Sequence, residues 1–238
     1  SLSNIRGIIF DKDGTLLNFQ KTWGSWIEDF LLSIIDTQTG IDKSLLHKMA
    51  ELLGYNLELK CFYPDSIILA DTPESGVRKI MPLLPMCSME NLLKLSEEAS
   101  ERVKPVQIVP LKVILSKFIS MNIVLGVVTN DSEKSAKKHM EYCGVSNSFK
   151  YIIGYDSGFG SKPDPDICLA FCTKSGISPD AVLMVGDSLH DMQAGKLAGM
   201  STVGVLSGLT KRDILEPLSD LILPDISYLA DWLITDRS

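Results

Sequence analysis

The sequence predicts an α/β fold in which a parallel β-sheet, covered by helices on both faces, is interrupted by an inserted all-helical region. Short apolar runs alternate with helical patterns after Pro110, as in strands joined by helical crossovers. The runs are apolar throughout, for example Val124 to Val128, as strands buried on both faces require. A similar run, Ile5 to Phe10, is separated from them by a long stretch with helical periodicity only.

The first strand is the run Ile5 to Phe10, and the inserted region begins soon after it. Four helices are predicted in the insert, over residues 21–38, 42–54, 73–84 and 89–102. Asp42 is expected to cap the second of them, and Pro73 opens the third. The segment 56–72 is expected to be irregular, and no strand is predicted between Leu16 and Lys104.

The rest of the chain alternates between helices and strands. Helices are predicted over residues 110–121, 132–143, 165–174, 189–198 and 226–233, with a short one after Thr210. Strands are predicted over residues 123–129, 151–153, 181–185, 202–205 and 220–223. The predicted core therefore comprises residues 1–17 and 105–238, and the insert 18–104 is expected to lie over the carboxyl edge of the sheet as a cap domain.

The composition favours a globular enzyme over a nucleic-acid or membrane protein. The chain has 238 residues, 45% of them hydrophobic, and a net charge of −7, which argues against a nucleic-acid partner. No apolar run approaches the ~20 residues of a membrane span. Five cysteines without a C-x-x-C pair, and no visible signal peptide, predict a reduced cytoplasmic protein. The sequence leaves both a monomer and a homodimer open.

Polar residues follow four of the predicted strands at the point where each strand ends. Because the carboxyl ends of parallel strands meet at one edge of a sheet, these residues are expected to converge. They are Asp11 and Asp13 after the first strand, Thr129 and Asn130 after the second, Lys162 in the loop after the third, and Asp187 and Asp191 after the fourth.

Four carboxylates at one edge would repel one another unless a cation neutralised them. A hard divalent ion, with Mg²⁺ the usual choice, suits oxygen ligands of this kind, and the lack of His or Cys among them argues against zinc. A carboxylate is also a competent nucleophile that forms an acyl phosphate. An ammonium such as Lys162, a hydroxyl and backbone N–H groups would balance the charge on a transferring phosphoryl group.

These residues carry a resemblance that extends over essentially the whole chain. The sequence resembles the haloacid-dehalogenase-like superfamily, and its insert resembles the cap of the phosphoglycolate-phosphatase-like branch. The resemblance implies a Rossmann-like catalytic core and a Mg²⁺-dependent phosphatase acting on a small phosphorylated metabolite. The motifs that carry it are Asp11-Lys12-Asp13-Gly14-Thr15, Val128-Thr129-Asn130, Lys162-Pro163 and Gly186-Asp187-Ser188 with Asp191.

The resemblance also implies a role for each site residue. Asp11 would attack phosphorus, and Asp13 would protonate the leaving oxygen and then deprotonate water. Asp11, the backbone carbonyl of Asp13 and Asp187 would hold Mg²⁺, with Asp191 ligating it or orienting a bound water. The phosphoryl oxygens would be held by Thr129, Lys162 and the backbone N–H groups of Lys12, Asp13 and Asn130. Thr15 would help to orient Asp13.

Two other functions remain open at this point. A phosphotransferase such as a sugar-phosphate mutase would use the same core, and a non-catalytic module would only bind phosphorylated ligands. Asp13 argues against the second, since binding alone needs no acid or base. Lys12 departs from the apolar residue common at its position, and its side chain is expected at the surface or against the cap. His139 is expected to have no function, and Asn130 or Asp131 to cap the following helix.

Overall fold

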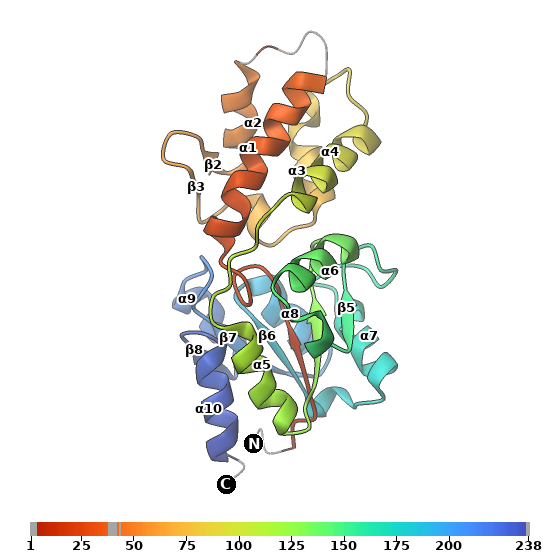
Figure 1. The fold of residues 1–238 in the computed structure, drawn as a ribbon, viewed down its shortest axis with the longest axis vertical. Helices are drawn as coiled ribbons and strands as arrows, with labels where there is room; N and C mark the ends of the chain where they lie inside the picture. The colour runs from red at the N-terminus through yellow and green to blue at the C-terminus, as the bar shows by residue number, and fades with distance from the viewer. Residues whose placement is uncertain (1–3, 38–41, 43, 237–238) are drawn as a thin grey trace. The chain divides into compact units, whose positions relative to one another are not determined.

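The computed structural model describes residues 4–37, 42 and 44–236 (Figure 1). The chain divides into two compact units. Ser1–Asn18 and Val106–Ser238 form one, called the core unit here, and Phe19–Pro105 form the other, called the inserted unit. These bounds lie one residue from those expected from the sequence. A cap role for the inserted unit stays a proposal.

The core unit is built on a six-stranded sheet in which every neighbouring pair is parallel, with the order β5-β4-β1-β6-β7-β8. The prediction of an α/β fold with a parallel sheet is therefore confirmed. The strands are β1 (Gly7–Phe10), β4 (Val124–Val128), β5 (Tyr151–Ile153), β6 (Val182–Gly186), β7 (Ser201–Val205) and β8 (Leu221–Leu223).

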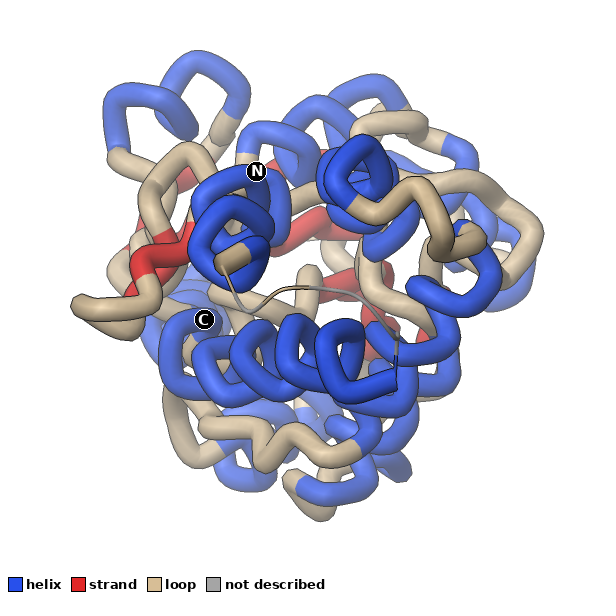
Figure 2. Tube along the Cα trace, turned by 90° about the horizontal axis from the view of Figure 1, so that it is seen from above, coloured by secondary structure: helices blue, strands red, loops and turns tan. Residues whose placement is uncertain are grey.

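Helices cover both faces of this sheet (Figure 2, helices blue and strands red). Ile8 and Phe10 pack in a cluster with residues of α5 and α10, whereas Ile9 packs in a second cluster with residues of α7 and α8. This alternation follows from the two-residue period of a strand. The helices are α5 (Leu111–Ser120), α6 (Glu133–Tyr142), α7 (Asp166–Ser175), α8 (Leu189–Leu197), α9 (Arg212–Leu215) and α10 (Ile226–Asp236).

The position of β1 at the centre of the sheet determines where the site residues come together. Phe10, the last residue of β1, lies beside Val127 of β4 and Val185 of β6 in the parallel register. The residues that follow these three strands therefore leave the sheet at the same edge. That edge carries Asp11, Thr129 and Asp187.

The inserted unit has its own apolar core. It contains α1 (Phe19–Thr37), α2 (Leu45–Leu53), α3 (Pro73–Ile80) and α4 (Met89–Glu101). Trp23, Trp26 and Phe30 of α1 are buried, and the indole N–H of Trp26 donates to the Ser96 carbonyl of α4 at 3.1 Å. These aromatic residues therefore form the unit's core. None of the described helices, in either unit, has the length and apolarity of a membrane span.

The expectation of an insert without strands is wrong in one detail. A two-stranded antiparallel ladder pairs β2 (Tyr55–Asn56) with β3 (Cys61–Phe62). The Asn56 side chain accepts from the backbone N–H of Leu59 at 2.8 Å and so closes the connecting turn. Strands of two residues are too short to show an alternating pattern, which is why the sequence gives no sign of them.

Candidate active site

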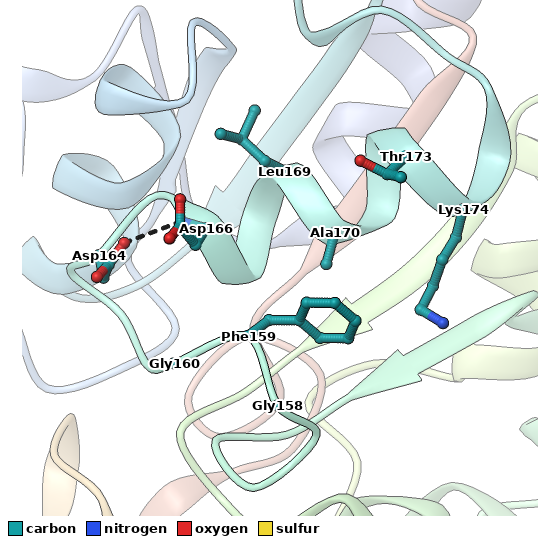
Figure 3. A pocket seen from close by; sticks show the side chains of 9 residues that line it. All are labelled: Gly158, Phe159, Gly160, Asp164, Asp166, Leu169, Ala170, Thr173 and Lys174. Atoms are coloured by element: carbon teal, nitrogen blue, oxygen red, sulfur yellow. Dashed lines mark hydrogen bonds between the residues drawn. The ribbon is translucent and has the colours of Figure 1, made fainter.

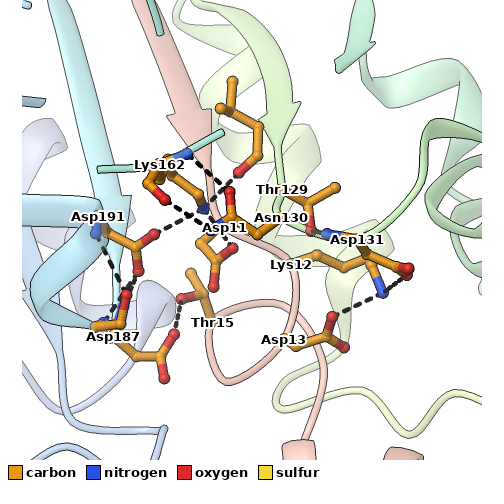
Figure 4. Close-up of polar contacts among 12 residues, drawn as sticks. Asp11, Lys12, Asp13, Thr15, Thr129, Asn130, Asp131, Lys162, Asp187 and Asp191 are labelled. Atoms are coloured by element: carbon orange, nitrogen blue, oxygen red, sulfur yellow. Dashed lines mark hydrogen bonds and ion pairs between the residues drawn. The ribbon is translucent and has the colours of Figure 1, made fainter. Parts of the chain in front are cut away.

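The site lies at the carboxyl edge of the core-unit sheet, and all its residues belong to that unit (Figure 4). Asp11 follows β1 directly, and its backbone N–H donates to the Val185 carbonyl of β6 at 2.9 Å. The chain then turns back on itself, since the N–H groups of Leu16 and Leu17 both donate to the Lys12 carbonyl. This turn holds the DxDGT segment against the ends of β4 and β6.

Three carboxylates meet at this edge. Asp11, Asp187 and Asp191 each offer an oxygen, and these oxygens lie within 4.8 Å of one another. Asp187 and Asp191 are buried, while the Asp11 side chain keeps 13% of its surface exposed. The carboxylate of Asp13 is not part of this cluster, because it pairs with Lys12 instead. The cluster is therefore a candidate cation site that is open on the side of Asp11.

Lys162 brings a buried positive charge to the cluster. Its ammonium lies 2.7 Å from Asp11 Oδ1 and 2.7 Å from Asp191 Oδ1, and it donates to the Val128 carbonyl at 2.8 Å. The lysine sits in the loop between β5 and α7 and reaches back across the end of β4. Its ammonium thus joins the carboxylates that follow β1 and β6.

Asn130 fixes the backbone of Lys162 rather than capping a helix. Its amide accepts from the Lys162 N–H at 2.8 Å and donates to the Lys162 carbonyl at 2.9 Å. Helix α6 is capped by Ser132, whose hydroxyl accepts from the N–H of Ser135 at 3.1 Å, so neither Asn130 nor Asp131 is the cap. The hydroxyl of the buried Thr129 accepts from the N–H of Asp131 at 3.0 Å, which leaves its own O–H as a donor at the site.

The two acidic residues after β6 have different surroundings. Asp191 Oδ2 accepts from the backbone N–H groups of Asp187 and Ser188, both at 3.0 Å, in the capping box that begins α8. Asp187 Oδ1 accepts from the Thr15 hydroxyl at 3.1 Å. Thr15 was expected to orient Asp13, but its hydroxyl orients Asp187 instead. A side chain at Gly14 or Gly208 would collide with the Asp187 carboxylate, so both glycines are needed to let the backbone surround it.

Burial and mutual repulsion shift the pKa values of this cluster. Burial and the charge of Asp191 raise the pKa of Asp11 from 3.8 to about 6, although Lys162 opposes them. Burial, with the charges of Asp11 and Asp191, also raises the pKa of Asp187 well above its usual range. Burial lowers the pKa of Lys162, but Asp11 and Asp191 raise it by more. The lysine alone therefore does not neutralise the three carboxylates.

The side chain of Lys12 is the main correction to the sequence analysis. It was expected at the surface or against the cap, but it is fully buried in the core unit. Its ammonium contacts Asp13 Oδ2 at 2.9 Å, Asp131 Oδ2 at 3.0 Å and His139 Nδ1 at 2.8 Å. His139, expected to have no function, is thus a buried neighbour of the DxDGT segment. Nothing in a single sequence links residues 12 and 139, because the fold alone brings them together.

A surface pocket of about 570 Å³ lies beside this edge, between residues 158–160 and α7 (Figure 3). Phe159 and Lys174 line it, with the ammonium 5.5 Å from the ring centroid. Its lining includes none of the site residues predicted from the sequence. Gly158 and Gly160 form part of its lining.

The comparisons with known proteins identify the family. The model of the haloacid dehalogenase-like hydrolases matches residues 8–205, which include all four motifs. The chain therefore belongs to the haloacid dehalogenase-like hydrolase family, as the resemblance implied.

The comparisons also found individual relatives and solved structures that are similar to parts or all of this chain. Phosphoglycolate phosphatase of Escherichia coli (strain K12) is 36% identical over 104 residues, which are 44% of this chain and 40% of that protein. The match thus spans less than half of the relative's length. The crystal structure of a predicted phosphoglycolate phosphatase from Haemophilus somnus 129pt has a TM-score of 0.70 at 20% identity, covering 98% of this chain and 99% of that one. That of β-phosphoglucomutase from Clostridium difficile has a TM-score of 0.64 at 18% identity, covering 98% and 96%. At these identities the structures show a shared fold.

Proposed function

We propose that the protein is a Mg²⁺-dependent phosphatase that hydrolyses a small phosphorylated metabolite through a phosphoaspartate on Asp11. The observation that carries this proposal is the position of the Asp11 carboxylate. It is partly exposed, lies 2.7 Å from the buried ammonium of Lys162, and shares a cluster with two further carboxylates. A carboxylate in this position can attack a phosphate ester while a nearby ammonium balances the negative charge of the phosphoryl group.

The chain's own residues account for both halves of the reaction. In the first half, an Asp11 oxygen forms a bond to phosphorus, the P–O bond to the alcohol breaks, and Asp13 gives its proton to the leaving oxygen. In the second half, Asp13 takes a proton from a water molecule whose oxygen attacks phosphorus, and the bond to Asp11 breaks. The products are an alcohol and inorganic phosphate, and both aspartates return to their starting states.

The site also suits a divalent cation. Three carboxylates and one ammonium leave an excess of negative charge, which a divalent cation would neutralise. Asp11, Asp187 and the backbone carbonyl of Asp13 would hold Mg²⁺, and Asp191, which already binds Lys162 and the start of α8, would orient its water shell. When bound, the ion supplies positive charge to the phosphoryl oxygens.

The remaining polar groups would bind the phosphoryl group. The Thr129 hydroxyl, the Lys162 ammonium and the N–H groups of Lys12, Asp13 and Asn130 are the proposed donors. The insertion of residues 19–105 between β1 and β4, both of which end at the site, supports a cap role for the inserted unit. A cap that closes would keep water away during the first half-reaction.

The similarity to phosphoglycolate phosphatase supports hydrolysis of a small acidic ester, although that match covers 40% of the relative. The fold shared with β-phosphoglucomutase favours a second candidate, a phosphotransferase that passes the phosphoryl group to a sugar hydroxyl instead of water. The two candidates differ in the acceptor and not in the role of Asp11.

A panel of phosphate esters tests the proposed function. With Mg²⁺ present, the protein is expected to release inorganic phosphate from at least one of phosphoglycolate, sugar phosphates, nucleotides and 4-nitrophenyl phosphate. Little release together with isomerised product, stimulated by a sugar bisphosphate, would favour the mutase instead. If no ester released phosphate but the protein still bound inorganic phosphate, a non-catalytic binding module would be favoured.

Removal of the metal should stop the reaction, and its return should restore it. EDTA is expected to reduce phosphate release to background, and added Mg²⁺ to recover it. Mg²⁺ alone should also raise the Tm of EDTA-treated protein by several degrees at saturating concentration, because it binds the folded state and neutralises the cluster. Asp187→Asn should remove this Tm shift. The control is Asp231→Asn, which changes an exposed acidic residue on α10 and should keep the Tm shift. If neither phosphate release nor Tm changed on addition of EDTA or of Mg²⁺, the proposed metal site would be ruled out.

A further inference from the structure

The buried side chain of Lys12 has no part in the steps described above. Its exposed fraction is 0%, whereas that of its partner Asp13 is 13%. Asp13 therefore lies between a buried ammonium and the open edge of the site. Burial of a charged lysine costs free energy unless the charge is paired, so the folded core unit requires this contact.

Three acceptors surround the Lys12 ammonium, and an ammonium has three N–H donors. The acceptors are Asp13 Oδ2 at 2.9 Å, Asp131 Oδ2 at 3.0 Å and His139 Nδ1 at 2.8 Å. Because carboxylate oxygens of Asp13 and Asp131 lie 2.9 and 3.0 Å from the Lys12 nitrogen, the group is an ammonium, and His139 Nδ1 accepts from it. All three contacts lie inside the core unit, and the Lys12 side chain has no exposed surface, so its ammonium acts on the site only through Asp13.

The two buried partners of Lys12, Asp131 and His139, are held by the start and the buried face of α6. Asp131 Oδ1 accepts from the N–H of Ser132 at 2.8 Å, at the start of α6, and His139 lies two turns further along the buried face of the same helix. The N–H of Asp131 donates to the Thr129 hydroxyl at 3.0 Å. One residue thus connects the lysine to both the start of α6 and a proposed phosphate-binding group.

We propose that Lys12 is a positioning residue that holds the Asp13 carboxylate at the angle required for proton transfer, with Asp131 and His139 as its buried anchor. The inference deepens the proposed function and rests on it. Asp13 Oδ2 is held by Lys12 at 2.9 Å, so rotation of the carboxyl group is restricted before substrate arrives. A small misalignment of a group that transfers a proton lowers the rate of the reaction strongly.

The test is a double-mutant cycle between Lys12→Met and Asp13→Ala, measured on an ester that the wild-type protein hydrolyses. Lys12→Met is expected to lower kcat about tenfold or more while KM stays within about threefold, since the substrate contacts remain. In the Asp13→Ala background the same change should lower kcat by less than about twofold, because the residue it acts through is gone. Lys117→Met, an exposed lysine paired with Asp231, is the matched control and should leave kcat unchanged.

A structural role predicts a different pattern. Lys12→Met leaves Asp131 buried without its ammonium and should lower Tm. Lys12→Met with Asp131→Asn removes that unpaired charge, so Tm should recover while kcat stays low. Recovery of kcat together with Tm, or an equal loss of kcat in both backgrounds of the cycle, would overturn the inference. An Asp13→Ala loss below threefold would instead contradict the proposed role of Asp13, and the inference with it.

Discussion

Asp11→Asn should abolish turnover, with a loss of kcat of about 10⁴-fold or more, because an amide oxygen is a poor nucleophile towards phosphorus. The fold should survive, since the amide oxygen still accepts from the Lys162 ammonium, which contacts Asp11 at 2.7 Å. The measurement is phosphate release under single-turnover conditions together with Tm. Asp231→Asn, which removes an exposed carboxylate of the same unit, should retain full activity.

The direction in which Asp11→Asn changes the stability of the folded protein can also be predicted. The pKa of Asp11 is raised from 3.8 to about 6 by burial and by Asp191, so the folded protein without metal holds this proton more tightly than the unfolded chain. The stability contribution of this carboxyl therefore falls as the pH rises through that interval. In EDTA at pH 8, the asparagine variant should melt at or above the wild-type Tm. A clear drop in Tm, or a near-normal rate, would contradict the assigned role.

Asp13→Ala is expected to lower kcat by at least ~10²-fold, the usual effect of losing a general acid or base. The loss should be larger for an alkyl phosphate than for 4-nitrophenyl phosphate, whose leaving group needs little help from a proton. Rates on both esters across a pH series provide the measurement. Lys12 keeps its contact with Asp131 at 3.0 Å in this variant, so the buried ammonium stays paired and the fold should hold.

Two results would count against this role. A loss below threefold on both esters would place the proton transfer elsewhere. An equal loss on the two esters would separate Asp13 from protonation of the leaving group. Asp231→Ala serves as the control for removing an exposed acidic residue and should leave both rates unchanged.

The parallel sheet could be predicted because its signals are local. Strands such as β4 and β6 are continuous apolar runs, and each is followed by polar residues, so both the strand and the edge it points to are visible in the chain. The ladder of β2 and β3 could not be predicted, because two residues carry no period. The bounds of α6 moved by one residue because Ser132 caps it, whereas α2 begins three residues later than expected and α3 ends four residues earlier.

The site was only partly predictable for a physical reason. The type and order of Asp11, Lys162 and Asp187 indicate the chemistry, and the strand ends bring them together. The surroundings of Lys12 depend on how the face of α6 packs against the DxDGT turn, and that packing joins residues 127 positions apart. A lysine in a sequence is normally interpreted as solvated, since burial of an ammonium requires partners that only the fold supplies. Its partners Asp131 and His139 were therefore missed together with it.

The covalent state of Asp11 during turnover tests the account most directly. The protein would be mixed with the ester found by the panel, quenched in acid within the first turnovers, and reduced with borohydride, which converts a phosphoaspartate to homoserine. Mass spectrometry of the peptide that contains residue 11 is expected to find homoserine at this position in the wild-type protein and none in Asp11→Asn. An unmodified Asp11 in protein that is actively releasing phosphate would contradict the account.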